Sequence, residues 1–203
     1  MKKLIVLSVF VLFTISLTNS CKKDNNNDDT RYGVISMQTN HGTIVLWLYD
    51  KTPLHKANFD SLAKAGFYDG LIFHRVIKDF MNQGGDPSGN GTGGPGYTIK
   101  AEITTSFTHK FGAVGAARDN NPEKRSNGSQ FYIVNNTSGA HSLDGNYTVF
   151  GETIDGLDVV TEIGNVATDP NDKPLTDVVM TKVEVVEYTA KELLDNFGFS
   201  VPD

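Results

Sequence analysis

Between Phe73 and Asp86 the sequence reads FHRVIKDFMNQGGD, an alternating strand pattern that ends in a glycine turn. The alternation predicts a strand with His74, Val76 and Lys78 on one face and Phe73, Arg75 and Ile77 on the other. An arginine among apolar residues, followed closely by an aromatic ring, a thioether and an amide, indicates an apolar pocket with a few polar groups. A buried strand whose arginine reaches the rim explains the same segment equally well.

The rest of the chain after Arg31 reads as short strands with helices set apart from them. Strands are predicted at 32–38, 43–48 and 178–186, and helices from Pro53 to the stop at Gly66, at 156–163 and at 189–197. The first two strands form a hairpin. His55, on the first helix, is expected to be a solvated surface histidine. Loop lengths favour antiparallel pairing, and this pattern by itself is typical of a closed antiparallel barrel or a sandwich.

The N-terminus predicts export and anchoring. Residues 1–20 carry two lysines and then an apolar run that is too short to favour a spanning helix, as in a secretory signal peptide. The run ends near Cys21, the only cysteine, in a stretch that resembles a bacterial lipobox, so Cys21 is predicted to be lipidated. An unmodified signal peptide cut near Cys21 is the alternative. The residues that follow, KKDNNNDDTR, are all polar, and 21–31 is predicted to be a flexible tether.

Charge and length limit which partners the mature chain can bind and how many domains it can form. Loss of the signal peptide would leave 16 basic residues against 24 acidic ones, a net charge of −8, and no basic stripe is present. Such a surface disfavours nucleic acid and anionic lipid, so contact with a membrane is expected through the lipid anchor only. The remaining 32–203 is long enough for one domain with its own core, and nothing in it indicates an obligate dimer. A monomer is expected.

Two other kinds of site are not expected from the sequence. The histidines His74, His109 and His141 are scattered among residues that are not metal ligands, so no metal is predicted. The stretch from Gly89 to Gly94 formally fits the dinucleotide pattern G-x-G-x-x-G. Pro95 follows it, however, in place of the helix whose N-terminus would meet a pyrophosphate. No cofactor is predicted.

Three stretches of the chain resemble one family. The patterns F-H-R-V-I-x-x-F-M-x-Q-G-G-D at 73–86, N-G-S-Q-F-Y-I at 127–133 and L-D-G-x-Y-x-V-F-G at 143–151 are similar to signatures of the cyclophilins, which are peptidyl-prolyl cis-trans isomerases. The resemblance covers nearly all of 32–187. It implies a mainly β fold, a closed eight-stranded antiparallel barrel capped by two helices, with 32–203 as the isomerase domain and a short C-terminal helical extension.

The resemblance also implies roles for individual residues. Arg75 would be catalytic, and the substrate would be bound by His74, Phe80, Met81, Gln83, Ala117, Arg118, Gln130, Tyr132, Ser142, Leu143 and Tyr147. A buried amide that ties loops together is the alternative for Gln130. Arg118 stands where many members carry Asn, and Ser142 stands where many carry Trp. That Trp contributes to binding the cyclic peptide drug cyclosporin, so weak binding of the drug is expected.

The implied activity is rotation about X–Pro peptide bonds in proline-containing polypeptides. This reaction needs neither a nucleophile nor a metal, because its barrier comes from amide resonance. With the export signal, the expected setting is the bacterial cell envelope, where the enzyme would assist protein folding. Two alternatives remain open on sequence grounds: a proline-peptide-binding chaperone module without essential turnover, and a surface adhesin or scaffold.

Overall fold

A computed structural model describes residues 29–202 of the chain. The predicted signal peptide, the predicted lipidation site at Cys21 and most of the predicted tether lie outside the described residues. The first strand begins at Arg31, one residue inside the predicted tether. Within the described part, no helix combines the length and apolar character that crossing a bilayer requires.

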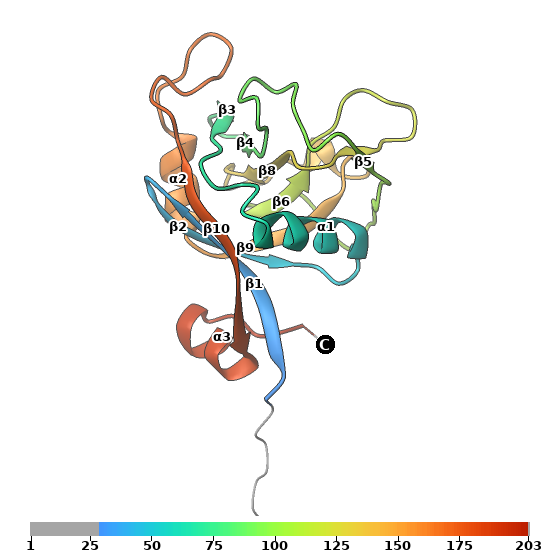
Figure 1. Ribbon diagram of the computed structural model, residues 1–203, viewed down its shortest axis with the longest axis vertical. Coiled ribbons are helices and arrows are strands. Elements are labelled where there is room, and N and C mark those ends of the chain that lie inside the picture. The colour runs from blue at the N-terminus through green and yellow to red at the C-terminus, as the bar shows by residue number, and fades with distance from the viewer. Residues whose placement is uncertain (1–28, 203) are drawn as a thin grey trace, which may run out of the picture.

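Eight strands within residues 29–202 form one antiparallel sheet in the order β10-β1-β2-β9-β6-β8-β4-β3 (Figure 1). They are β1 (Arg31–Thr39), β2 (Gly42–Leu48), β3 (Phe73–Ile77), β4 (Met81–Gly84), β6 (Ala113–Ala116), β8 (Phe131–Val134), β9 (Val149–Asp155) and β10 (Met180–Thr189). Two short strands, β5 (Thr98–Ile99) and β7 (Ser126–Asn127), pair separately. The helices are α1 (Pro53–Lys64), α2 (Leu157–Gly164) and α3 (Ala190–Phe197), with a 3₁₀ turn η1 (His141–Leu143).

Local chemistry explains why the predicted helices form where they do. Pro53 occupies the first turn of α1, and Gly66 follows the helix with φ of +69°, which glycine adopts without strain. Thr189 and Glu192 form a capping box at the start of α3, and Gly198 ends that helix in the left-handed conformation. These helices and the β1–β2 hairpin confirm the predicted elements.

The prediction of a closed barrel is wrong, because the sheet curls without closing. Its edge strands, β3 and β10, share no ladder; a single isolated bridge joins Ile72 to Val179 beside them. From Arg75 onward, β3 pairs only with β4, and the loop that contains Asp172 covers its free side. The fold is therefore a mainly β open half-barrel. α1 and α2 pack against the sheet, while α3 lies apart beside the ends of β1 and β10 (Figure 1).

The sheet is buried on both faces, so its strands contribute to two apolar clusters. The period-2 alternation of β2 shows the division: Ile44 and Leu46 belong to a first cluster, and Val45 and Trp47 belong to a second. The first cluster fills the space between the sheet and the helices α1 and α2. The second includes Tyr132 and Met81 as well as Leu193 of α3, so it supports the predicted site.

His55 is buried, which corrects the prediction of a solvated histidine. Its side chain is 2% exposed, with Nδ1 2.7 Å from a carboxylate oxygen of Glu102 and Nε2 2.9 Å from the hydroxyl of Ser126. Both partners are distant in sequence and come from segments that fold over the buried face of α1. The apolar pattern of a helix does not reveal a buried histidine when the polar partners of its ring come from distant segments of the chain.

Candidate functional site

A β-bulge in β3 directs Arg75 toward the site. Phe73 pairs with Gly84 and Arg75 pairs with Gln83, so His74 is an extra residue without a partner in β4. The prediction that Phe73 and Arg75 share a face is therefore wrong. Phe73 is fully buried in the first apolar cluster, whereas the Arg75 side chain is 44% exposed. An inserted residue rotates the side chains that follow it, which is how bulges commonly re-aim a residue.

Most of the residues predicted for the site line one cavity of about 130 Å³. They are Arg75, Phe80, Met81, Gln83, Ala117, Arg118, Tyr132, Leu143 and Tyr147. They come from β3, β4, the turn between these two strands, β8, η1 and the loops after β6 and η1, which the sheet order brings together. Aromatic, thioether and aliphatic groups form most of the wall, and Arg75 and Gln83 add polar groups. A cavity of this size and lining can accept a small apolar ring.

The other predicted residues lie nearby but outside this cavity. His74 lines a second, adjoining cavity. The side-chain amide of Gln130 donates to the carbonyls of Gly91 and Gly93, while its oxygen accepts from Gln83, so it links the glycine-rich loop to the site. Ser142 is exposed on η1. The roles predicted for these three residues remain predictions.

Of the two adjacent residues predicted to bind peptide through their backbone, Arg118 is the better placed. The N–H of Ala117 donates to the carbonyl of Gln130, and its carbonyl accepts from the N–H of Asn127. Both backbone groups of Ala117 are therefore engaged. The backbone N–H and C=O of Arg118 have no hydrogen bond to any described residue. Its guanidinium lies over the ring of Tyr147, 4.5 Å from the centroid, which holds the side chain at the rim.

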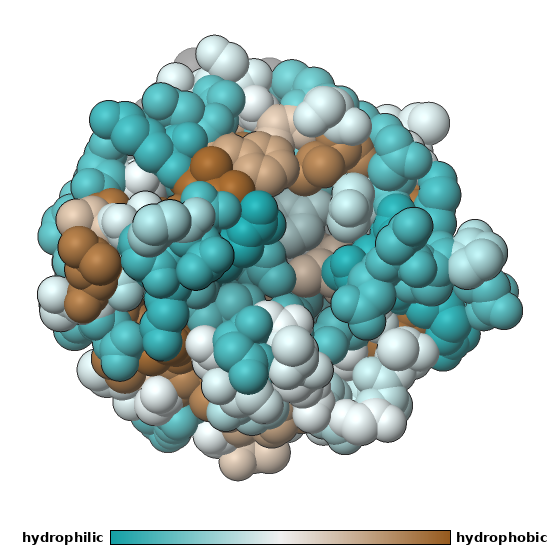
Figure 2. All heavy atoms as spheres, turned by 90° about the horizontal axis from the view of Figure 1, so that it is seen from above, coloured by the Kyte–Doolittle hydropathy of each residue, from teal (hydrophilic) through white to brown (hydrophobic). Residues whose placement is uncertain are grey.

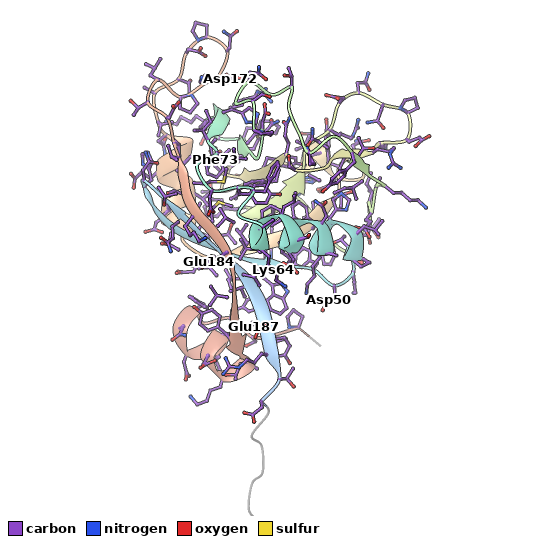
Figure 3. The ribbon with its side chains drawn as sticks, viewed as in Figure 1. Asp50, Lys64, Phe73, Asp172, Glu184 and Glu187 are labelled. Atoms are coloured by element: carbon purple, nitrogen blue, oxygen red, sulfur yellow. The ribbon has the colours of Figure 1, made fainter. Side chains whose placement is uncertain are left out.

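Arg75 has a carboxylate partner that the sequence did not reveal. Its Nε lies 3.4 Å from Oδ2 of Asp172, and the carbonyl of Asp172 accepts from the N–H of Val76 at 2.8 Å. Figure 3 shows Asp172 on the loop at the top of the view, above Phe73. Both charged side chains are about two-fifths exposed (44% and 40%), so the pair contributes little to stability. Within residues 29–202 the guanidinium makes no other hydrogen bond, which leaves its remaining N–H groups for a ligand.

The ring of Tyr132 is fixed from behind. Its hydroxyl lies 2.8 Å from Nε2 of His109, whose Nδ1 lies 2.6 Å from a carboxylate oxygen of Asp144. Burial alone would raise the pKa of Asp144, but hydrogen bonds from His109 and His141 lower it to about 2. Burial lowers the pKa of His109 despite the nearby carboxylate, so the neutral imidazole is favoured. The ring also rests on Gly115, where a Cβ would lie 2.2 Å from Cζ of Tyr132.

The glycine-rich loop encloses an internal carboxylate. Asp86 is 1% exposed, and its side chain accepts from the backbone N–H groups of Ser88, Asn90 and Gly91. Burial would raise the pKa of Asp86, but these backbone donors hold it below its usual value. A Cβ on Gly93 would lie 2.1 Å from the same carboxylate. The N–H groups that a phosphate would need are thus already occupied.

Two sets of residues at the site were missed at the sequence level. Asp172 lies 97 positions from Arg75, and Asp144 lies 35 positions from His109. Neither separation follows a helix or strand period, so no local pattern could join these pairs. Among residues 29–202, no group of three or more His, Cys, Asp or Glu side chains is arranged to hold a metal ion.

Comparison with known proteins agrees with this geometry. Residues 34–185 match the family described as cyclophilin type peptidyl-prolyl cis-trans isomerase/CLD. Peptidyl-prolyl cis-trans isomerase-like 1 of Neurospora crassa is 40% identical over 156 residues, which cover 75% of this chain and 93% of that protein. A putative peptidyl-prolyl cis-trans isomerase of Staphylococcus saprophyticus is 36% identical over 181 residues, covering 74% of this chain and 90% of that protein.

A solved structure gives the same result for the fold. A Cryptosporidium parvum cyclophilin type peptidyl-prolyl cis-trans isomerase, crystallised in the presence of the dipeptide ala-pro, superposes with a TM-score of 0.70 at 31% identity. The match covers 75% of this chain and 98% of that one. The chain therefore belongs to the cyclophilin family of peptidyl-prolyl cis-trans isomerases.

Proposed function

We propose that this cyclophilin accelerates rotation about X–Pro bonds in exported or envelope proteins of a bacterium and so assists their folding. The observation that carries the proposal is the cavity of about 130 Å³, in which an arginine lies at the edge of an aromatic and aliphatic wall. A proline ring is small and apolar and fits such a wall. The barrier of about 18–20 kcal/mol arises from amide resonance, so a site without a nucleophile is sufficient.

In the proposed mechanism, the cavity favours the twisted amide over the planar one. Phe80, Met81 and Tyr132 seat the proline ring, and Leu143 closes the wall. The backbone of Arg118 and the amide of Gln83 hold the flanking peptide. When the amide twists, the prolyl nitrogen gains a lone pair. The guanidinium of Arg75 then donates to that nitrogen or to the proline carbonyl and stabilises the transition state.

We further propose that the protein is a monomer anchored to the envelope by acyl chains on Cys21. The support is the position of the only cysteine, which lies at the end of the predicted signal peptide and before a polar stretch. Each buried CH₂ contributes about 0.8 kcal/mol, so more than one acyl chain holds a protein firmly at a bilayer. The anchor would restrict the active site to substrates close to one membrane face.

The test uses the full chain, solubilised in a mild detergent, with Arg75→Ala and Arg75→Lys alongside. Loss of one transition-state donor is expected to lower kcat/KM for an Ala-Pro peptide by about 100-fold or more. Arg75→Lys keeps the positive charge but lacks the forked guanidinium, so its kcat/KM should lie between those of the wild type and Arg75→Ala. Arg31→Ala is the matched control, because Arg31 is also an exposed arginine in a single ion pair, 3.8 Å from Glu192. Unchanged turnover in Arg75→Ala would refute the mechanism.

Fatty-acid labelling of the full chain tests the anchor. The label should be present on the wild type and absent from Cys21→Ser.

One observation favours the alternative of a proline-peptide-binding chaperone module. Asp172 pairs with Arg75 and offsets part of the charge that catalysis would use. In that case the full chain would bind proline peptides with little turnover, and Arg75→Ala would change affinity alone. Fast turnover that Arg75→Ala abolishes decides in favour of the enzyme.

A further inference from the structure

A second cavity, of about 490 Å³, adjoins the first one. The two share Arg75, Gln83 and Arg118, and the second is also lined by residues of two loops and the bulge: His74, Gly89, Asn90, Gly91, Asp169, Asn171 and Lys173. Viewed from above, this end of the molecule has a central hollow bordered largely by hydrophilic side chains (Figure 2). A peptide with its proline in the first cavity would enter the second as it crosses Gln83 and Arg75.

The second cavity carries cations that lack carboxylate partners. The ammonium group of Lys173 and the guanidinium of Arg118 form no ion pair with any residue in 29–202. The carboxylate of Asp169 is engaged, because one of its oxygens accepts from the backbone N–H groups of Asn171 at 2.7 Å and Lys173 at 2.9 Å. With Arg75 paired to Asp172, the lining retains a net positive charge on a chain whose formal net charge is −6.

His74 supplies a further polar group at this wall. Its residue is 6% exposed, and neither ring nitrogen has a hydrogen-bond partner among the described residues. A buried, unpartnered imidazole is unusual and points to a polar ligand. The bulge places the ring against Gly91, with Nε2 3.9 Å from where a Cβ of Gly91 would lie.

We propose that the second cavity is a subsite for an acidic side chain of the substrate, an Asp or Glu within about three residues of the proline in an extended peptide. A carboxylate there would lie near the ammonium of Lys173 and the guanidinium of Arg118, which both donate charge-assisted hydrogen bonds. The inference rests on the proposed function, because it extends the peptide from the proline cavity. It predicts that the loop with Lys173 makes the enzyme prefer some X–Pro sequences over others.

The test measures how one side chain of the peptide affects turnover. Capped Ala-Pro peptides carry Glu, Gln or Lys at each of the three positions on either side of the proline, so that only the side-chain charge differs. The wild-type full chain in detergent should prefer Glu over Gln by about 3- to 10-fold in kcat/KM at one position, as expected for partly exposed ion pairs. The preference should shrink as salt is raised.

Three variants locate the origin of the preference. Lys173→Gln should remove most of the Glu/Gln ratio, and Lys173→Glu should reverse it in favour of Lys peptides. Lys64→Gln is the matched control, because Lys64 is an exposed lysine on α1 that lines neither cavity. It should leave the ratio unchanged. A ratio that survives Lys173→Gln would overturn the assignment to this cavity.

The outcomes separate this subsite from the proposed function. If the wild type turns over neutral peptides but treats Glu and Gln alike at every position, the subsite is refuted and the isomerase proposal stands. If it turns over none of the peptides, the isomerase proposal fails. The subsite is then judged by the affinities of the same peptides, measured by fluorescence anisotropy, and equal affinities for Glu and Gln peptides would refute it as well.

Discussion

Tyr132 shows how a single side chain in this site depends on groups outside it. A carboxylate can only accept, so Asp144 requires a proton on Nδ1 of His109. In the neutral imidazole Nε2 is then an acceptor, and the Tyr132 hydroxyl donates to it. This chain of hydrogen bonds holds the ring that forms part of the wall of the cavity of about 130 Å³.

Tyr132→Phe removes the hydroxyl but keeps the aromatic ring. We expect it to lower the free energy of unfolding by about 1–3 kcal/mol, because Nε2 of a buried histidine loses its donor. The aromatic wall remains, so kcat/KM should stay within about 3-fold of the wild type. Urea unfolding and peptide turnover measure the two effects. Tyr147→Phe is the control, since the Tyr147 hydroxyl makes no hydrogen bond within residues 29–202. Equal stability of the two variants would contradict the argument.

At the scale of elements, α1 depends on a carboxylate from a distant loop. Its N-cap residue, Thr52, makes no side-chain capping bond, and the helix has no acidic residue in its first turn. Glu102 supplies both functions by accepting from the N–H groups of Leu54 and His55, each at 3.0 Å. It also accepts from the His55 ring. A single loop residue therefore fixes the start of the helix that covers the first apolar cluster.

Glu102→Ala should destabilise the protein by about 2–4 kcal/mol, because two helix N–H groups and a buried imidazole lose a charged acceptor. Glu102→Gln keeps one acceptor oxygen and should recover about half of that loss. Thermal or urea unfolding measures both. Glu123→Ala, in a loop and with a 76% exposed side chain, should change the stability by less than about 0.5 kcal/mol. If Glu102→Ala behaved like Glu123→Ala, Glu102 would not act as the cap.

Across the molecule, three histidines are buried in separate parts of the fold, and burial favours the neutral imidazole in each. Burial lowers the pKa of His55, His74 and His109 below the usual value of 6.5. The nearby carboxylates of Glu102, Asp86 and Asp144 oppose this lowering at the three histidines in turn. At His74 the cations Arg75 and Lys173 lower the pKa further. In the unfolded chain these histidines would titrate normally.

This arrangement predicts that stability falls as the pH drops below about 6.5. The unfolded state then binds protons that the folded state excludes, so the stabilisation is complete above the unfolded pKa and is lost between it and the lower folded pKa. Between about pH 7.5 and about pH 5 we expect the free energy of unfolding to fall by about 1–3 kcal/mol. Urea unfolding across this range measures it, and NMR titration of the ring protons assigns it to residues. A flat profile would rule out the proposed protonation states.

Features that depend on neighbouring residues could be predicted without the folded structure. The capping box at Thr189, the proline at the start of α1 and the glycine after its end each act within one or two turns of the chain. The site residues on β4 and β8 followed from continuous motifs, and the register of those strands brings them together. The same locality explains why the family resemblance named all nine residues that line the cavity of about 130 Å³.

Features that depend on residues far apart in sequence became visible only in the folded protein. The bulge at His74 separates Phe73 from Arg75, the loop with Asp172 covers the open edge of the sheet, and the burial of His55 depends on Glu102, 47 positions away. Each of these depends on where distant segments meet when the sheet curls. Strand alternation and helix periodicity record which face of an element is apolar, but they carry no information on the polar partner that a distant loop will place there.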